Sequence, residues 1–257
     1  MPVETLSDSP HLSRPLGYRV CALRALFVLL GLLAWHWTQS LLGARPAPAE
    51  EPHLAISGAV LTQGDKLLEL SSPINVYLNE HRRVAHALLI VSSAMIDVLG
   101  VFLLGWSIVG SSVRPFVGLL VLFGLRQITQ ALCALPQPEG MIWPEQGPGF
   151  PSLLVTYKVG NDFFFSGHTA IAVIGAIELG RFVGSRTRGM AAWATQIAIA
   201  TCATFLVAVV LVLRAHYTMD VFAGILAAIL AADLASRIAP RCDAALARIA
   251  VARNLTR

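Results

Sequence analysis

Long runs of apolar residues dominate the chain and alternate with short polar stretches. Each run is close to the roughly 20 apolar residues that a helix needs to cross the hydrocarbon core of a bilayer. We therefore expect an all-α, polytopic membrane protein, because helices satisfy their own backbone hydrogen bonds in lipid. The pattern predicts six transmembrane helices, over residues 20–42, 85–109, 115–135, 163–183, 190–213 and 218–238.

The composition agrees with a membrane protein. Hydrophobic residues make up 56% of the 257 positions and charged residues only 13%, whereas a soluble globular domain carries about 25% charged residues. The mean hydropathy is +0.67 and the pI is near 9.1. The net charge of +4 comes from arginines beside apolar runs, where such residues set membrane topology, so we expect no nucleic-acid partner.

Basic residues also predict the orientation of the spans. Arginines precede the first apolar run and follow the last one; Arg114 lies between the second and third runs, and Arg186 between the fourth and fifth. Cytoplasmic loops are enriched in such residues and the number of spans is even, so both termini are expected in the cytoplasm. The other connections, at 43–84, 136–162 and 214–217, then face the exoplasmic side.

These expectations divide the chain into three parts. They are a cytoplasmic basic arm over 1–19, a six-helix membrane domain over 20–238 with an exoplasmic loop at 43–84, and a cytoplasmic basic tail over 239–257. Within the loop, the stretch 65–83 has the pattern of an amphipathic interfacial helix. The four cysteines show no metal-ligand spacing, so we expect neither a metal site nor a disulfide framework.

One polar patch, Arg214–Val221, places a histidine and an acid four residues apart. On a helix this spacing would bring the Cβ atoms of His216 and Asp220 to about 5–6 Å from each other. The carboxylate could then accept a hydrogen bond from one imidazole nitrogen, which fixes the tautomer and leaves the other nitrogen as a nucleophile. Thr218 is expected to cap the last helix.

A second patch, Ser166-Gly167-His168, opens the fourth predicted span. Gly167 lets the backbone approach a ligand closely, and the N–H groups of a helix N-terminus suit a phosphate. His168 would stand beside that phosphate as general acid and then base. A single histidine near a membrane interface is more often a bystander, but two histidines at matching depth favour one joint site.

The two patches resemble the last two motifs of the type-2 phosphatidic acid phosphatase superfamily. They are more similar to its sphingomyelin synthase and ceramide phosphotransferase group. That group's Gly-Asp-x-x-Phe-Ser-Gly-His-Thr is matched over Asp162–Thr169, with Asn161 in place of Gly, and its His-Tyr-Thr-x-Asp-Val is matched over His216–Val221. An upstream Arg-x-x-Thr is matched at Arg126 and Thr129, and the Leu-Pro-x-Pro after it by 135–138. The resemblance covers roughly residues 85–240.

The resemblance implies a reaction in two steps. His216, oriented by Asp220, attacks the phosphorus of a phospholipid head group, and a phosphohistidine forms while His168 protonates the departing diacylglycerol oxygen. His168 then deprotonates the hydroxyl of an acceptor, which is ceramide or a similar lipid alcohol such as diacylglycerol. The transferred group would be phosphocholine or phosphoethanolamine. No metal and no organic cofactor are required.

Departures from the phosphatase pattern bear on the alternative function. Ser107 and Val210 stand where phosphatases of that superfamily carry Lys and Arg. A site with fewer cations suits a phosphodiester better than a phosphomonoester, so a transferase is favoured over a lipid phosphate phosphatase. Arg214 stands where the sphingomyelin synthase and ceramide phosphotransferase group has a histidine. The sequence therefore does not say which residue makes that phosphate contact here. A catalytically silent membrane scaffold is the alternative outside the enzymes.

Three further residues are candidate substrate contacts: Arg126, Asp162 and Ser166. Arg126 is predicted near mid-membrane, at a depth similar to that of Asp97. Charged residues there face the bundle interior, so Arg126 either pairs with Asp97, or contacts the phosphate, or does both. Asp162 either holds an ammonium head group or satisfies the helix dipole.

The sequence determines neither the substrates nor the cellular compartment. The head group could be choline, ethanolamine or inositol, and neither the acceptor nor the oligomeric state follows from the sequence. The active site of this integral membrane protein is expected on the exoplasmic face. That face belongs to the inner membrane in a bacterium, or to the Golgi or plasma membrane in a eukaryote.

Overall fold

The structure is a computed structural model that describes residues 17–43, 64–133, 135–143, 152–155 and 164–252. Helices account for 82% of the described residues, and none of these residues lies in a strand. This confirms the all-α prediction. The helices are α1 (Tyr18–Gly43), α3 (Lys66–Leu70), α4 (Ser72–Glu80), α5 (Arg82–Val109), α6 (Arg114–Leu132), α7 (Gly167–Gly184), α8 (Gly189–Val212) and α9 (Thr218–Ala252).

Five of these helices are long and apolar enough to cross a membrane, namely α1, α5, α6, α8 and α9. The fourth expected span, α7, is 18 residues long and is not among them. His168, Glu178 and Arg181 lower its hydropathy, although residues such as Ala170 and Ile174 are fully buried in the bundle. The apolar helices therefore make the chain an integral membrane protein. The sixth span and the side of the membrane on which each terminus lies stay predictions.

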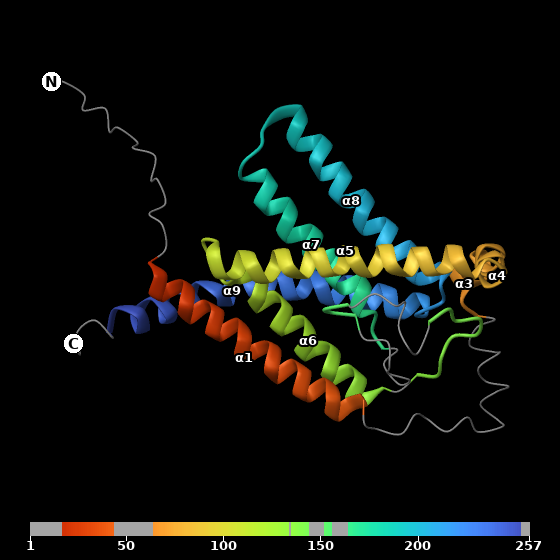
Figure 1. Ribbon diagram of the computed structural model, residues 1–257, viewed down its shortest axis with the longest axis horizontal. Helices are drawn as coiled ribbons and strands as arrows, with labels where there is room; N and C mark the ends of the chain where they lie inside the picture. The colour runs from red at the N-terminus through yellow and green to blue at the C-terminus, as the bar shows by residue number, and fades with distance from the viewer. Residues whose placement is uncertain (1–16, 44–63, 134, 144–151, 156–163, 253–257) are drawn as a thin grey trace.

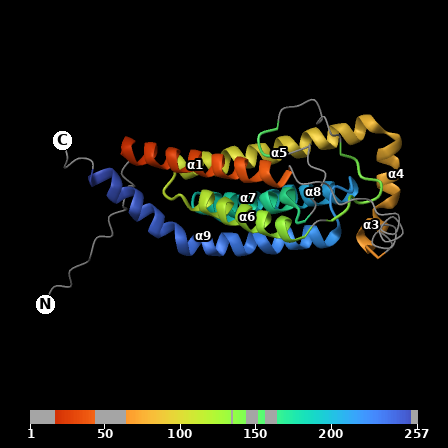
Figure 2. The ribbon, with the colours of Figure 1, turned by 90° about the horizontal axis from the view of Figure 1, so that it is seen from below.

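The long helices form one bundle with α7 at its centre. Figure 2 shows α6 and α7 between α1 and α5 on one side and α9 on the other. α7 packs against α5, α6, α8 and α9, and the main apolar core surrounds it, with Ile96, Leu119 and Ile174 among its fully buried side chains. In Figure 1, α8 runs back from α7 as a hairpin that leans away from the other helices.

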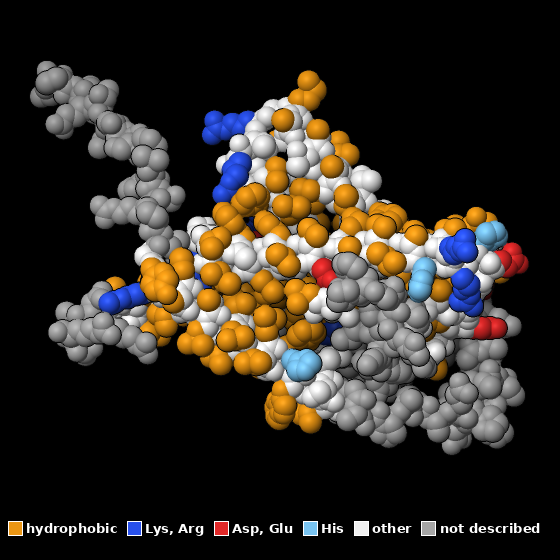
Figure 3. Space-filling model, in the orientation of Figure 1, with side chains coloured by type: hydrophobic (Ala, Val, Ile, Leu, Met, Phe, Trp, Pro, Cys, Tyr) orange, Lys and Arg blue, Asp and Glu red, His pale blue; other side chains and the backbone are white. Residues whose placement is uncertain are grey.

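The surface of the bundle fits a lipid environment. Hydrophobic side chains cover the middle of the face shown in Figure 3, and charged side chains lie mostly toward its ends. Large apolar residues such as Val98 and Leu226 are exposed on α5 and α9. A soluble monomer rarely exposes so extensive an apolar surface, whereas lipid tails would cover it.

A polar cluster closes the end of the bundle where α1 and α6 begin. Arg24 is buried, with 3% of its surface exposed; its guanidinium donates to the Gly110 carbonyl at 2.6 Å and to Asp243 at 2.7 Å. Asp243 also accepts from the Ser112 hydroxyl and the Val113 amide. One carboxylate thus joins α1, the α5–α6 turn and α9.

The last helix continues past its expected end at residue 238. α9 runs through Pro240 to Ala252, so much of the expected basic tail is helical. Alanine favours helix more than any other residue, and Ala244, Ala245 and Ala247 follow the proline. Asp243 on this extension makes the contacts to Arg24 described above, so the extension is also held by an ion pair with a buried arginine.

Candidate active site

The two polar patches of the sequence meet in the structure. The Ser166 amide, just before α7, donates to the Asp220 carbonyl in the first turn of α9 at 3.1 Å. The Ser166 side chain accepts from the Thr169 amide at 3.3 Å and so caps α7. Ser166 and Asp220 are buried. Ser166 therefore acts in the structure as a helix cap and as the link between the two patches.

A glycine permits this close approach of α7 and α9. A Cβ atom built on Gly224 would lie 2.8 Å from the Ser166 carbonyl oxygen and 3.4 Å from the Cβ of Thr169. Real Cβ atoms do not approach backbone oxygen so closely. Since Gly224 stands one helical turn after Asp220, the absence of its side chain helps to set the distance between the two histidine-bearing segments.

His216 and Asp220 are neighbours, but they do not share a helix as the spacing suggested. α9 begins at Thr218, so His216 lies in the preceding turn. Its Nδ1 is 3.7 Å from the Asp220 Oδ2, which is within ion-pair range and longer than a hydrogen bond. Asp220 Oδ2 instead accepts the Tyr217 amide at 3.0 Å. The acid therefore holds the backbone of the turn by a hydrogen bond and lies beside the Nδ1 of the imidazole.

Thr218 does not cap α9 in the expected way. It is the first residue of that helix, and its own amide and hydroxyl both donate to the Asp65 carboxylate, the amide at 2.8 Å. Tyr217 also lies in this turn. Its burial, followed by the nearby Asp220 and Asp65 carboxylates, raises the pKa of the Tyr217 hydroxyl.

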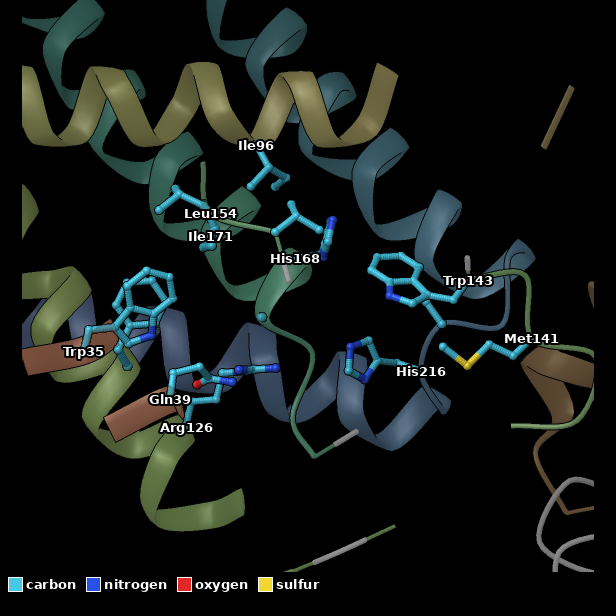
Figure 4. A pocket seen from close by; sticks show the side chains of 14 residues that line it. Trp35, Gln39, Ile96, Arg126, Met141, Trp143, Leu154, His168, Ile171 and His216 are labelled. Atoms are coloured by element: carbon cyan, nitrogen blue, oxygen red, sulfur yellow. The ribbon is translucent and has the colours of Figure 1, made fainter. Parts of the chain in front are cut away.

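Both histidines line one small cavity inside the bundle. Its volume is about 60 Å³, and His168, His216, Arg126 and Gly167 contribute to its walls together with apolar residues such as Trp143. Figure 4 shows His168 and His216 on neighbouring sides of this space, with Arg126 reaching toward it from α6. Since one water occupies about 10–15 Å³ by the same measure, the cavity holds a phosphate-sized group but not a whole lipid.

Arg126 adds positive charge to the N-terminal end of α7. Its Nε donates to the Phe165 carbonyl at 3.2 Å, and a Cβ atom on Gly167 would lie 3.0 Å from the same nitrogen. Gly167 therefore allows the guanidinium to lie against the first turn of the helix. An arginine beside a helix N-terminus forms a site suited to an anion.

Asp97 does not pair with Arg126. Its carboxylate accepts from the Ser152 hydroxyl at 3.1 Å and from the Leu153 and Leu154 amides at 2.9 and 3.0 Å. These bonds fold the segment 152–155 over the cavity, which Leu154 and Val155 line. The alternative in which Arg126 and Asp97 form a structural pair is therefore wrong, and Arg126 lines the cavity.

Trp143 is a site residue that the sequence did not point to. Its indole makes an edge-to-face contact with the His168 ring, with centroids 5.5 Å apart. The Ile142 amide donates to the Leu213 carbonyl at 2.9 Å, which holds this segment against the α8–α9 turn. Trp35 and Gln39 of α1 also line the cavity. No motif surrounds any of these residues, so only the fold brings them to the site.

Arg214 does not line the cavity. Its guanidinium donates to the Glu139 carbonyl at 2.7 Å and to the Ser72 hydroxyl at 2.6 Å, so it binds α4 and a neighbouring loop. Asp162 lies outside the described residues. No group of three or more His, Cys, Asp or Glu with the arrangement of a metal site occurs in the part of the chain that the structure describes.

Comparison with known families decides among the candidate lipid phosphotransferases. The model of the AtPDCT1/2 family, phosphatidylcholine:diacylglycerol cholinephosphotransferase, matches residues 65–237, about two thirds of the chain. The chain belongs to the AtPDCT1/2 family. The match begins at the N-terminus of α3, and of the described helices that line the histidine cavity it includes all but α1. No curated protein and no solved structure matches the chain.

Membership in the AtPDCT1/2 family makes the protein a lipid head-group phosphotransferase of the membrane. It also corrects the resemblance inferred from the motifs. The assignment to the sphingomyelin synthase group and to the type-2 phosphatidic acid phosphatase superfamily is wrong, because the matching family model is AtPDCT1/2. Short histidine strings identify the kind of chemistry, whereas the family match extends over most of the fold.

Proposed function

We propose that the protein transfers phosphocholine from phosphatidylcholine to diacylglycerol, with His216 as nucleophile and His168 as general acid and base. The observation that carries this proposal is the convergence of both histidines, Arg126 and the α7 N-terminus on one phosphate-sized cavity. The substrates are those in the name of the AtPDCT1/2 family, and diacylglycerol is an acceptor of the class expected from the motifs.

In the first step His216 attacks the phosphorus of phosphatidylcholine. Its Nδ1 is directed to Asp220, so the attacking atom is Nε2. The bond between phosphorus and the glycerol oxygen breaks, and this oxygen leaves with a proton from His168. Arg126 and the backbone amides of the first turn of α7 stabilise the negative charge on the phosphoryl oxygens. A phosphocholine-histidine and diacylglycerol result.

In the second step an incoming diacylglycerol occupies the place of the one that left. His168 accepts the proton of its hydroxyl, the oxygen attacks phosphorus, and the bond to His216 breaks. Leaving group and acceptor are the same kind of alcohol, so one general acid–base residue serves both directions by microscopic reversibility. Among the described residues, His168 Nε2 is buried without a hydrogen-bond partner, which suits an atom that exchanges its proton with substrate.

The active site is proposed to face the exoplasmic side. His216 lies in the α8–α9 turn, and the basic residues Arg186 and Arg188 lie in the α7–α8 connection at the other end of α8. The positive-inside rule assigns the arginine-rich end to the cytoplasm. The site then opens to the leaflet at the opposite surface.

The test is a transfer assay in liposomes with the purified protein. Phosphatidylcholine labelled in its choline is the donor and a fluorescent diacylglycerol is the acceptor. We expect doubly labelled phosphatidylcholine, with a loss of at least about 10²-fold in His168→Ala and His216→Ala, in line with typical general acid–base contributions. His36→Ala is the matched control, because His36 is an exposed histidine on α1 that does not line the cavity.

Two further results would decide the mechanism. Acid-labile, alkali-stable label bound to the protein, absent in His216→Ala, together with ping-pong kinetics, would support the covalent intermediate. Sequential kinetics with no bound label would overturn it. Transfer to ceramide but not to diacylglycerol would refute the proposed acceptor, and free phosphate from phosphatidic acid without any acceptor would refute the transferase.

A further inference from the structure

The short helices α3 and α4 hold the turn that carries His216. Asp65 caps α3 by accepting the Leu68 amide at 3.2 Å, and the same carboxylate accepts both donors of Thr218. Thr218 is the first residue of α9 and lies two residues after His216. One acidic side chain therefore connects α3 directly to the base of the catalytic turn.

Two more side chains hold the same turn. Asn75 of α4 is buried, and its amide donates to the Val212 carbonyl at 2.9 Å and to the Gly140 carbonyl at 3.1 Å. Arg214 donates in the opposite direction, to the Ser72 hydroxyl at 2.6 Å. The turn between α8 and α9 is thus bound to α3 and α4 before His216, at residues 212 and 214, and after it, at residue 218.

The outer side of the two helices is apolar and exposed. Leu67, Leu70, Ile74 and Tyr77 follow one another at intervals of three, four and three residues, with 46%, 77%, 52% and 49% of their surface exposed. Leu67 and Leu70 on α3, and Ile74 and Tyr77 on α4, are each three residues apart, which places each pair on one face of its helix. Leu68 and Leu78 point the other way and are buried at 0% and 2%.

The position of this apolar stripe indicates what covers it. Figures 1 and 2 show α3 and α4 at one end of the bundle, with α4 crossing the direction of α5. α4 ends at Glu80 and α5, a helix able to span the membrane, begins at Arg82. In the first turn of α5, next to α4, Val84 is also exposed. An amphipathic helix beside the end of a span lies at the boundary of head groups and acyl chains.

We propose that the apolar stripe of α3 and α4 is embedded in the head-group boundary of the bilayer and that Asp65 transmits this position to the catalytic turn. Asp65 is a positioning residue: it contacts Thr218, not the reacting phosphate. In this arrangement the membrane surface itself fixes the depth of His216 relative to the phosphate layer of its lipid substrate. The effect on catalysis rests on the proposed function, whereas the contact with lipid does not.

The contact is tested on the full-length protein in nanodiscs of phosphatidylcholine that carries a diazirine next to the glycerol backbone. After illumination, mass spectrometry locates the lipid adducts. We expect adducts within 66–80 in the native protein and a several-fold loss in a Leu70→Gln/Ile74→Gln variant. A native protein with adducts on α5 but none on α3 or α4 would overturn the proposal, whatever its enzymatic activity.

The coupling is tested by transfer kinetics in the same nanodiscs. Asp65→Asn removes the charge and one of the two carboxylate acceptors, and we expect kcat to fall about tenfold, as for a sub-ångström displacement of a catalytic group. KM for phosphatidylcholine should stay within twofold, because the lipid contacts are unchanged. Thr218→Ser keeps both donors and should retain the native kcat, whereas Thr218→Val loses the hydroxyl and should resemble Asp65→Asn.

Two controls separate positioning from general damage. Asp233→Asn removes an exposed acid that pairs with Arg237 on α9, and Ile249→Gln changes an exposed apolar residue on the same helix; both should leave kcat unchanged. An Asp65→Asn protein with native kcat would overturn the coupling. Active protein without adducts on α3 and α4 would refute this inference and leave the proposed function intact.

Discussion

Gly224 sets how closely α7 and α9 approach beneath the histidine cavity, and Gly224→Ala tests whether that distance matters. The added methyl would lie 2.8 Å from the Ser166 carbonyl oxygen, whereas ordinary contact begins near 3.4 Å. The two segments must therefore separate by 0.6 Å at this point, the difference between those distances. The movement strains the hydrogen bond from the Ser166 amide to the Asp220 carbonyl, which links the two histidine-bearing segments.

Two opposing terms act on the stability of this variant. An extra methyl in a packed interior costs about 1–3 kcal/mol, while replacing glycine by alanine inside a helix contributes about 1 kcal/mol. We expect a net loss of up to about 2 kcal/mol. Activity should fall further than stability suggests, because a displacement of about 1 Å can cost 10²-fold in rate. For 0.6 Å we expect kcat to fall about tenfold, with KM nearly unchanged.

The assay measures transfer of labelled phosphocholine to diacylglycerol, beside thermal unfolding in detergent. Gly124→Ala is the matched control: this glycine also lies within a helix, and a Cβ atom there would have no neighbour within 4 Å. The control should keep native activity and gain slightly in stability. Native kcat in Gly224→Ala, or an equal loss in Gly124→Ala, would refute the reasoning that this contact sets the geometry of the site.

Three further predictions follow from buried polar and aromatic contacts. Asp243→Ala leaves the buried Arg24 guanidinium without its carboxylate, and the free energy of unfolding should fall by about 3–5 kcal/mol; an unchanged unfolding midpoint would contradict this. Glu178→Gln weakens hydrogen bonds from two partly exposed arginines, so a smaller loss of about 1.5–3 kcal/mol is expected in the same measurement. Trp143→Leu removes the edge-to-face contact with His168, and kcat should fall about three- to tenfold, as such ring pairs contribute about 0.5–1.5 kcal/mol; an effect on KM alone would argue against orientation of the imidazole.

The sequence was most informative about features that depend on neighbouring residues. Apolar runs predicted the helical architecture, and Ser166-Gly167-His168 was correctly placed at the start of a helix. The expected proximity of His216 and Asp220 was confirmed. The backbone conformation differs from the expected one, because His216 lies in the turn before α9 and Asp220 lies in the first turn of that helix. Local spacing indicates which groups can meet but does not show which backbone conformation brings them there.

The sequence was less informative where contacts come from distant segments. Asp97 and Arg126 are a natural pair by charge and depth, yet Asp97 binds the amides of the segment 152–155. Trp143 and Asp65 reach the site through connections whose path the hydrophobic pattern does not define. The family assignment failed for a related reason, since the shared strings reflect phosphoryl chemistry and say little about the lipid that supplies the acceptor hydroxyl.

The polar character of α7 bears on how the chain enters the bilayer during synthesis. Glu178 and Arg181 would each add several kcal/mol to the free energy of insertion if either stood alone in hydrocarbon, but they form an i,i+3 pair at 2.7 Å, and Arg114 of α6 also binds Glu178. If α7 crosses the membrane as predicted, it is too polar to contact lipid alone when it leaves the translocon. Its integration would then depend on α6, made before it, and on the strongly apolar α8, made after it. Biogenesis of the proposed catalytic centre would thus be cooperative, because the helix that carries His168 would enter the membrane together with its neighbours.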